Sequence, residues 1–361
     1  MNTNKNSTLG ASQISSKRLS ILAKNWALFF LLILILIFSF TGKRFFHLAN
    51  FQNILHLSTT YLLLSASETF VIITGGIDLS VGFVMGLSSV LAATMMQQMH
   101  AVNFPPALSI SIGSIVTLII CIIPGLLSGI LITRYKVPPF IATLGMGGIT
   151  SGLTLIMCGG FPVTFLPPYL TEMGNGYMIY ILPGKAVSFF NRPEGIVGGE
   201  LKELVRIIPF SFIFIFIVLI ILWHILKNTK FGQHTYAIGG NMDAAVRAGI
   251  NTNRHLIIVY VLSSFLAGLA GVFNVFQTGV GNFTPFTAMY ELLAIAGVII
   301  GGASLMGGKG GIFGSVIGVI LIGVIENGLH LSGVDPFYRF IAVGLVLITA
   351  VVIDQSFPDL L

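Results

Sequence analysis

Charged side chains are scarce in this chain: Asp, Glu, Lys and Arg make up 8% of its 361 residues, whereas 55% are apolar. A soluble domain carries about 25% charged residues, so this chain lacks the polar groups needed to cover a water-facing surface. Apolar runs of about 18 to 25 residues recur along its length, and each can cross the ~30 Å hydrocarbon layer of a bilayer. The composition predicts an all-α polytopic membrane protein.

Sequence patterns that would indicate an enzyme, a cofactor or a metal are also missing. The two cysteines, Cys121 and Cys158, lie in apolar runs and identify neither a compartment nor a disulfide. Histidines within the apolar runs stand singly and no HExxH motif occurs, so no metal site is expected. A phosphate-binding loop needs G-x4-G-K-[ST], and the nearest string, GGASLMGGKGG, has Ala303 and Gly310 at two of the required positions. We therefore expect no catalytic activity, nucleotide site or cofactor in this chain itself.

The apolar runs predict about ten membrane crossings, the first of them uncleaved because no small-x-small cleavage site follows it. Basic residues collect in cytoplasmic loops, and eleven of the 18 fall on the inside when the N-terminus is cytoplasmic. The net charge of +6 is explained by this topology and does not indicate nucleic-acid binding. We expect both termini in the cytoplasm, with an N-terminal tail at 1–24, one transmembrane domain at 25–354 and a C-terminal tail at 355–361. The predicted crossings are 25–41, 51–74, 79–98, 107–133, 138–159, 207–227, 255–278, 289–304, 311–330 and 337–354.

A long loop at 160–206 separates the fifth and sixth crossings and faces the periplasm in this topology. It is rich in Pro, Gly and aromatic residues, and a segment this irregular does not face lipid. We expect a periplasmic cap with short helices, in which the string YMIYIL dips back into the membrane interface. The cap either receives a partner protein or only covers the bundle.

Two similar strings interrupt the apolar runs. VIITGGIDLS (71–80) and VIIGGASLMG (298–307) each end an apolar run with paired glycines and lead into another helix. Both fall at cytoplasmic-side connections in the predicted topology. Transporters use broken helices of this kind to line a transport pathway. We therefore predict broken-helix elements near 74–82 and 301–310.

One polar stretch, YAIGGNMDAAVRAGINTNR (236–254), stands between two strongly apolar runs. Asn241 suits the N-cap of a helix and Asp243 complements the positive charge of its first turn. Gly249 follows as the residue that ends a helix in the left-handed conformation. The helix predicted at 242–248 has about two turns, too few to be stable alone in water. Its own membrane spans or another protein must therefore hold it in place.

These strings together resemble one family. DAAVRAG (243–249) fits the acidic-Ala-Ala-x3-Gly loop of permease subunits of ATP-binding cassette importers, and the longer AIGGNMDAAVRAGI is similar to its ribose/galactose branch. TGGIDLSVG (74–82), VPPFIATLGM (137–146) and YELLAIAGVIIGGASLMGGKGGIFGSVIG (290–318) resemble further parts of that branch in the same order. The resemblance spans residues 50 to 354. Leu293 departs from it, since the family pattern ELDAIA has Asp there, so no role of that Asp carries over.

The resemblance implies a multi-pass subunit of the bacterial inner membrane that works as a pair, with a second copy or a paralogue. Two cytoplasmic ATPase subunits would bind it and hold ATP and magnesium, while a periplasmic solute-binding protein would deliver the sugar. The polar helix would be the coupling helix of a cytoplasmic loop at 228–254, seated in a cleft of the ATPase. The residues assigned to it are Gly239, Gly240, Asn241, Asp243, Ala244, Ala245, Arg247 and Gly249.

Polar residues inside the apolar runs are candidates for a pathway or gate, because charged groups in a membrane are costly and mostly functional. The candidates are Glu68, Gly75, Gly76, Asp78, Ser80, Asn274 and Gln277. Each has a structural alternative: Asp78 can cap the helix that follows it, and Glu68 can satisfy an interhelical bond. The two amides suit sugar hydroxyls but can also simply pack. Glu291 and Glu326 lie near helix ends, where anchoring is expected.

Two functions from different classes fit these observations. The favoured one is the membrane subunit of an ATP-driven, binding-protein-dependent importer that moves a sugar or sugar-like solute into the cytoplasm by alternating access. The alternative is a proton-coupled secondary transporter of a small polar solute, with Glu68 or Asp78 as proton carrier. That alternative gives no reason for the polar helix at 242–248.

Overall fold

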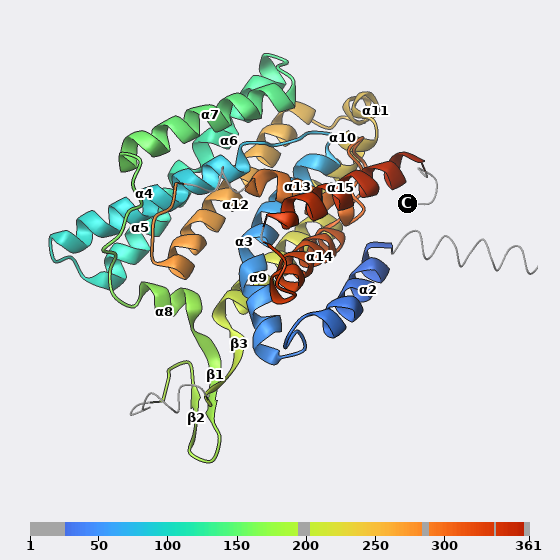
Figure 1. The fold of residues 1–361 in the computed structure, drawn as a ribbon. Coiled ribbons are helices and arrows are strands. Elements are labelled where there is room, and N and C mark those ends of the chain that lie inside the picture. Colours follow the sequence, from blue (N-terminus) through green and yellow to red (C-terminus); the bar gives the residue numbers. More distant parts are fainter. Residues whose placement is uncertain (1–25, 194–202, 284–288, 336, 357–361) are drawn as a thin grey trace, which may run out of the picture.

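Residues 26–193, 203–283, 289–335 and 337–356 are described by the computed structural model of this chain (Figure 1). The predicted N-terminal tail, and the predicted C-terminal tail after residue 356, lie outside these residues. The longer helices are α2 (Trp26–Thr41), α3 (Leu48–Ile73), α4 (Val81–Ala101), α5 (Pro106–Ile120), α6 (Ile122–Arg134), α7 (Pro139–Cys158), α9 (Phe210–Asn228), α12 (Thr252–Thr278), α14 (Ile312–Leu331) and α15 (Tyr338–Ser356). The shorter elements are α8 (Leu170–Asn175), α10 (Lys230–Gly240), α11 (Met242–Arg247), α13 (Tyr290–Ile300), β1 (Tyr177–Leu182), β2 (Ala186–Phe189) and β3 (Val205–Pro209).

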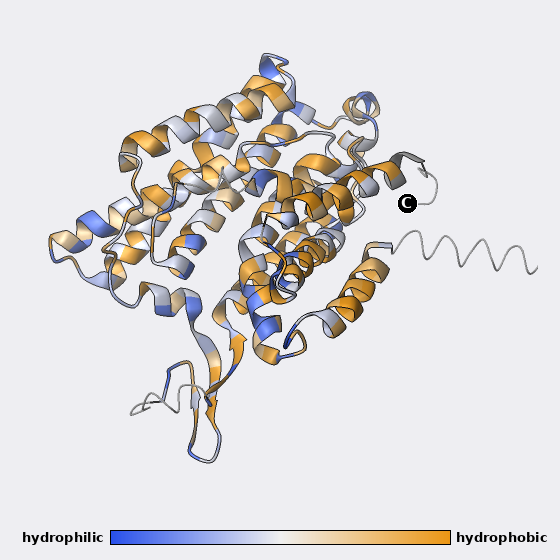
Figure 2. Ribbon diagram, viewed as in Figure 1, coloured by the Kyte–Doolittle hydropathy of each residue, from blue (hydrophilic) through white to orange (hydrophobic). Residues whose placement is uncertain are grey.

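Within the described part of the chain, six helices are long and apolar enough to cross a membrane, counting α5 and α6 as one. The helix α3 also has the length, with 26 residues, but it is more polar and is buried along most of its course. Most residues of the helices are apolar (Figure 2), and many large apolar side chains are exposed, such as Ile115, Ile156 and Leu345. A polytopic helical membrane protein, as predicted from composition, explains this pattern.

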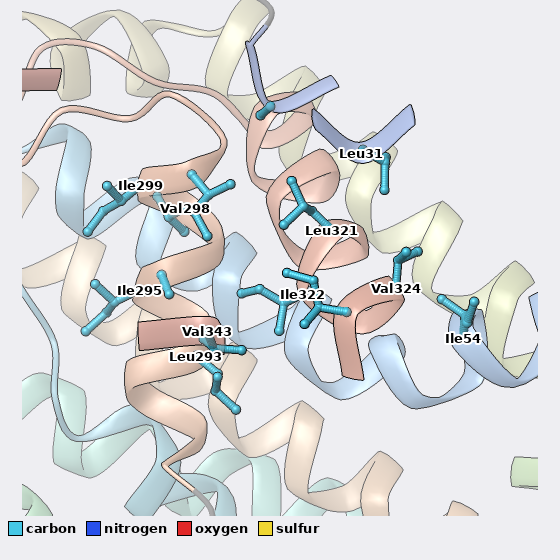
Figure 3. Packing of buried hydrophobic residues seen from close by; sticks show 14 of the residues in the cluster. Leu31, Ile54, Leu293, Ile295, Val298, Ile299, Leu321, Ile322, Val324 and Val343 are labelled. Carbon is cyan, nitrogen blue, oxygen red and sulfur yellow. The ribbon is translucent and has the colours of Figure 1, made fainter. Parts of the chain in front are cut away.

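The helices α3 and α12 form the centre of the bundle. α12 packs against α6, α4 and α3, while α3 also packs against α13 and α14. Small residues let the helices approach closely: a Cβ atom on Gly129 of α6 would lie 2.9 Å from the Cα of Ile257 in α12. Between α13 and α14 the core is filled by branched apolar side chains, joined by Leu31 of α2 and Ile54 of α3 (Figure 3).

The molecule has two contrasting ends (Figure 1). At one end, here called the α11 end, lie α10, α11 and the residues that follow α3 and α13. At the other, the sheet end, lie α8 and the strands β1 to β3. Helices α3 and α9 run from the sheet end to the α11 end, and α12 runs the opposite way.

The crossing predicted at 289–304 is wrong in its length. The helix α13 has 11 residues, which at ~1.5 Å per residue is about 16 Å, half of a ~30 Å hydrocarbon layer. It starts beside α3, where Tyr290 stacks on Tyr61 with ring centroids 4.8 Å apart. It ends where the backbone of Gly301 lies directly against Gly314 of α14. The second interruption therefore makes a half-length helix and not a complete span.

The expectation of an all-α chain is wrong in the loop at 160–206. The string YMIYIL is strand β1, the centre of an antiparallel sheet with the order β2-β1-β3. Its β-branched and aromatic residues favour a strand, and Pro183-Gly184 forms the turn to β2, closed by a 3.1 Å bond from Lys185 N to Leu182 O. Pairing in a sheet gives hydrogen-bond partners to backbone N–H and C=O groups that would have none in an irregular cap. The expected short helix is also there, as α8.

Candidate functional site

The helix α11 is capped as its sequence predicts. The side-chain oxygen of Asn241 accepts a 2.9 Å bond from the amide of Ala244. Beyond the helix, Gly249 has φ +83°, the left-handed conformation that glycine adopts without strain. Two backbone bonds close the end, from Ile250 N to Ala245 O at 3.1 Å and from Gly249 N to Val246 O at 3.0 Å. This pair of bonds is a Schellman motif, so the local structure is fixed within the stretch itself.

The inner face of α11 is held by neighbouring helices. Ala245 is buried and packs with Ile238 of α10 and Leu256 of α12. The rest of the helix faces outward and combines apolar and charged side chains: Met242 and Val246 are 45% and 53% exposed, and Asp243, Ala244 and Arg247 are exposed as well. Of the residues predicted to form the coupling helix, Ala245 therefore anchors α11 to the bundle, while its exposed neighbours form the surface that a partner can reach.

The residues just before α11 join the two interrupted helices. The carbonyl of Ile73, the last residue of α3, accepts a 2.8 Å bond from the amide of Gly308 in the loop after α13. Gly239 of α10 lies over this bond so closely that a Cβ atom there would overlap the Ile73 carbonyl and lie 2.6 Å from Gly308 N. The predicted broken elements near 74–82 and 301–310 thus meet each other and α10 at one point, here called the glycine junction.

Tyr236 adds a side-chain bond to the glycine junction. Its hydroxyl donates to the carbonyl of Gly310 over 2.8 Å. Burial raises the pKa of Tyr236 above its ordinary value of 10.0, so the hydroxyl stays protonated and remains a donor at neutral pH. The helix that leads into α11 is therefore tied to the loop between α13 and α14 by both a side chain and close backbone packing.

A buried polar cluster lies deeper in the bundle, where the loop after α3 turns back into α4. Asp78 accepts three hydrogen bonds on its carboxylate: from the amide and the hydroxyl of Ser80 at 2.9 and 2.5 Å, and from the hydroxyl of Ser263 at 2.8 Å. One carboxylate oxygen of Glu68 lies 3.5 Å from the amide of Asp78. All four residues are at most 1% exposed. Asp78 thus holds the turn before α4 and links it to α12, which is a structural role. It does not cap α4 as the structural alternative predicts, because the N-cap of α4 is Ser80 and no side chain of the described residues accepts a bond from the first turn.

Two carboxylate oxygens near this cluster lack partners. Within the described residues, Oε1 of Glu68 and Oε2 of Glu291 are buried and accept no hydrogen bond. Glu291 lies directly against Gly82, in the first turn of α4, where a Cβ atom would overlap its carboxylate. Burying a carboxylate without a full set of partners is costly, and intramembrane acids of this kind are functional candidates. Glu68 therefore remains a candidate for the pathway.

Gly75 and Gly76 line a cavity of about 250 Å³ that reaches α11. Met242 of α11 and Tyr260 of α12 also line it. The space therefore lies between the first broken helix and the surface-exposed α11. A displacement of α11 would change the shape of this cavity directly.

The structure does not bring Asn274 and Gln277 to the buried polar cluster. They lie at the sheet end of α12, and Asn274 is eleven residues beyond Ser263, or about 16 Å along the helix. The side-chain nitrogen of Gln277 donates to the backbone carbonyl of His56 at 3.2 Å. The backbone carbonyl of Gln277 accepts from the side-chain nitrogen of Asn175 at 2.8 Å. Gln277 thus ties α12 to α3 and α8.

Sequence reasoning missed three residues of these sites: Tyr236, Ser263 and Gly308. Tyr236 opens the polar stretch, and Ser263 belongs to a serine pair inside an apolar run, so both gave a weak signal. Gly308 is one of several glycines in its loop, and nothing local distinguishes it. Its role depends on contact with Ile73, which is more than two hundred residues away.

Comparisons with known proteins find a family model and several import permeases similar to this chain. A family model described as "Branched-chain amino acid transport system / permease component" matches residues 50–351. The ribose import permease protein RbsC of Bacillus subtilis (strain 168) is 36% identical over 329 residues, covering 90% of this chain and 91% of that protein. The galactose/methyl galactoside import permease protein MglC of Haemophilus influenzae is 32% identical over 348 residues, covering 94% and 96%. The D-allose transport system permease protein AlsC of Escherichia coli (strain K12) is 33% identical over 329 residues, covering 91% and 90%. No solved structure matches the chain.

Proposed function

This chain belongs to the permease family of ATP-binding cassette sugar importers, and from that premise we propose that it is the membrane subunit of an ATP-driven, binding-protein-dependent importer. The importer moves a sugar or sugar-like solute into the cytoplasm by alternating access. The α11 end faces the cytoplasm and the sheet end faces the periplasm of a bacterial inner membrane. Two such subunits, identical or paralogous, work together.

One observation carries this proposal: the exposed α11 is joined through α10 to the ends of both interrupted helices. Its outward face offers Met242, Asp243, Val246 and Arg247 to a partner. Its base, through Gly239 and the preceding helix, lies on the bond between Ile73 and the loop after α13. A partner that binds ATP and prefers one arrangement of the pair can thus bias the broken helices. The bias is limited by the difference in affinity for the two arrangements.

Under this proposal the ATP and magnesium belong to the cytoplasmic ATPase that receives α11. The solute-binding protein docks at the sheet end, where Val187, Phe189 and Phe190 are exposed. Exposed apolar residues on a protruding sheet suit contact with a partner protein.

A crosslinking experiment tests the coupling role of α11. We replace Cys121 by Ala and Cys158 by Ser, and then introduce cysteine at Val246, which is 53% exposed, or at Ala245, which is 4% exposed. In whole membranes, Val246→Cys should capture the ATPase through a short bifunctional reagent, while Ala245→Cys should capture little. Cysteine at Phe189, on the sheet, is the control for the other end and should capture no ATPase.

The opposite result would favour the proton-coupled alternative. If Val246→Cys captures no ATPase, and uptake persists without ATP but collapses with the proton gradient, the importer assignment is wrong. The buried acids Glu68 and Glu291 would then be the first residues to replace.

A further inference from the structure

A small cavity with polar and apolar lining lies between α3 and α14, apart from every site described above. Its volume is about 190 Å³, and Ser58 and Tyr61 of α3 line one side of it. From α14 come Gly323, Glu326 and Asn327, which share one helical face because they are spaced three and four residues apart. Ser58 is ten residues from Glu68 along α3, or about 15 Å, so the cavity is nearer the sheet end than the buried polar cluster.

Two polar atoms of this cavity lack hydrogen-bond partners among the described residues. They are the hydroxyl oxygen of Ser58 and the side-chain oxygen of Asn327, and both are buried. Ser58 itself is 1% exposed. Gly323 of α14 packs directly against Ser58, since a Cβ atom there would lie 2.7 Å from the Ser58 hydroxyl oxygen. Buried polar groups without a partner cost about 1–3 kcal/mol each, so the cavity is built to receive a group that can hydrogen-bond.

The lining chemistry narrows the occupant to a polyhydroxylated molecule. The cavity presents a hydroxyl, a carboxamide and the carboxylate of Glu326, with His330 at its edge, and these groups donate and accept bonds to alcohols. Tyr61 adds an aromatic ring, held by its stack on Tyr290, which suits the C–H face of a sugar ring. A lipid tail would leave the oxygens of Ser58 and Asn327 unpaired. A metal ion has too few ligands here, since no three His, Cys, Asp or Glu side chains are grouped anywhere in the described residues.

The size of the cavity fits a monosaccharide. A water molecule needs ~10–15 Å³ of such volume, so 190 Å³ holds on the order of a dozen water-sized groups. This is close to the number of non-hydrogen atoms in a pentose or hexose. A larger oligosaccharide would not fit without displacement of α3 or α14.

We propose that the cavity between α3 and α14 is a passage site that binds a single sugar ring through Ser58, Glu326 and Asn327. This inference rests on the proposed function and adds to it the place where the sugar first meets the membrane subunit. The cavity lies toward the sheet end, where the binding protein releases its solute. Tyr290, in the first turn of α13, connects the occupant of the site to the second broken helix.

Transport by the complete complex tests this proposal. The permease, its ATPase and its binding protein are reconstituted in liposomes, and ATP-driven uptake is measured with radiolabelled D-ribose, D-galactose and D-allose and with their monodeoxy analogues. Asn327→Leu keeps nearly the same side-chain size and shape but removes the carboxamide, and we expect uptake of the transported sugar to fall at least 10-fold in kcat/KM. Ser58→Ala removes only the hydroxyl and should reduce uptake about 3- to 10-fold.

Discrimination between sugars separates binding from a merely structural role. A site that hydrogen-bonds a sugar hydroxyl rejects the analogue that lacks it. In Ser58→Ala the preference for the transported sugar over at least one monodeoxy analogue should therefore fall by 5-fold or more relative to the wild type. The matched controls are Ser111→Ala, an exposed serine of α5 bonded within its own helix, and Asn53→Leu, exposed on α3; neither should change the preference.

The possible outcomes separate this proposal from the proposed function. If the wild type transports a sugar with ATP but both cavity variants keep its rate and its discrimination, the cavity holds only water and the passage site is wrong. If the wild type transports none of the sugars with ATP, the proposed function fails and the passage site fails with it. Loss of discrimination in Ser58→Ala, with normal amounts of complex in the membrane, supports the site.

Discussion

The two interrupted helices look alike in sequence, yet they are stabilised in different ways. In the loop after α3, side chains make the bonds: Asp78 accepts from Ser80 and Ser263, and the amide of Leu79 donates to the hydroxyl of Thr143 over 3.1 Å. In the loop after α13 the bonds are mostly between backbone groups, such as Ser304 N to Lys309 O at 3.2 Å. Tyr236 supplies a side-chain bond from outside.

The two loops differ in their hydrogen bonds because they differ in how deeply they are buried. The first loop is mostly buried, and a buried backbone needs partners that a tight turn alone does not supply. Thr143 of α7 accepts from the amide of Leu79, and the Asp78 carboxylate accepts from the amide of Ser80. The second loop reaches the surface, where Met306 is 75% exposed, and a compact glycine-rich turn is enough. We expect changes in the first loop to affect mainly stability, and changes at the contact of the second loop with α10 to affect mainly coupling.

The largest effect is expected at the glycine junction. In Gly239→Val the new side chain overlaps the Ile73 carbonyl, and overpacking of this kind costs about 1–3 kcal/mol, enough to separate α10 from both loops. ATP-driven uptake should fall about 30-fold or more while the protein still reaches the membrane. Gly240→Ala is the matched control, since a Cβ atom there meets no atom within 4 Å. Equal uptake by the two variants would mean that the junction transmits nothing.

The second prediction concerns the stability of the first loop. Asp78→Ala leaves the hydroxyls of Ser80 and Ser263 without their acceptor, and bonds to a charged group are worth about 1.5–3 kcal/mol. The melting temperature of the purified permease in detergent should fall clearly. Asp78→Asn keeps one acceptor oxygen, so its melting temperature should fall less than that of Asp78→Ala. A melting temperature unchanged by Asp78→Ala would remove the structural role assigned to this carboxylate.

A smaller effect, on coupling alone, is expected from Tyr236→Phe. The change deletes one bond to Gly310, worth about 0.5–1.5 kcal/mol, and leaves the packing of the ring. Sugar transported per ATP hydrolysed should fall about 2- to 10-fold, with little change in melting temperature. Tyr135→Phe, at a tyrosine that is 72% exposed, serves as the control. A loss of stability without loss of coupling would reverse the proposed distinction between the loops.

The smallest effect is expected from Thr143→Val in α7. It keeps the shape of the side chain but removes the acceptor for the amide of Leu79, at a cost of about 1 kcal/mol. The melting temperature should fall slightly, and the sugar transported per ATP should not change. Thr143 bonds the first loop through its hydroxyl, at Leu79 and Ile77, and Tyr236 bonds the second loop through its hydroxyl, so this pair is the most direct comparison of the two loops.

The parts of the structure that could be predicted are those whose causes are local. The apolar runs specify the helices, and the caps of α11 depend on bonds that reach at most five residues along the chain, from Ile250 to Ala245. The sheet at 177–209 also had a local signal, because Pro183-Gly184 follows a run of β-formers. The strongly apolar composition of the whole chain favours helices, and this wider signal outweighs the local one.

The remaining features depend on contacts between distant segments. The glycine junction joins Ile73, Gly239 and Gly308, and no spacing in the sequence says that these three should meet. The inward orientation of Ala245 follows from its packing on α10 and α12, and the short length of α13 follows from its contact with α14. The cavity at Ser58 is a property of two helices whose residues there are more than 250 positions apart.

The glycine junction also has a consequence for protein engineering. The caps of α11 are complete within residues 241–250, which suggests that this stretch could be exchanged between related permeases to redirect them to another ATPase. The helix before it is not self-contained, because Gly239 fits against Ile73 and Gly308. A chimera that receives residues 230–250 should therefore function only when the segments around 73 and 308 come from the same donor. The transplantable unit is then three separate pieces of sequence that are contiguous only in space.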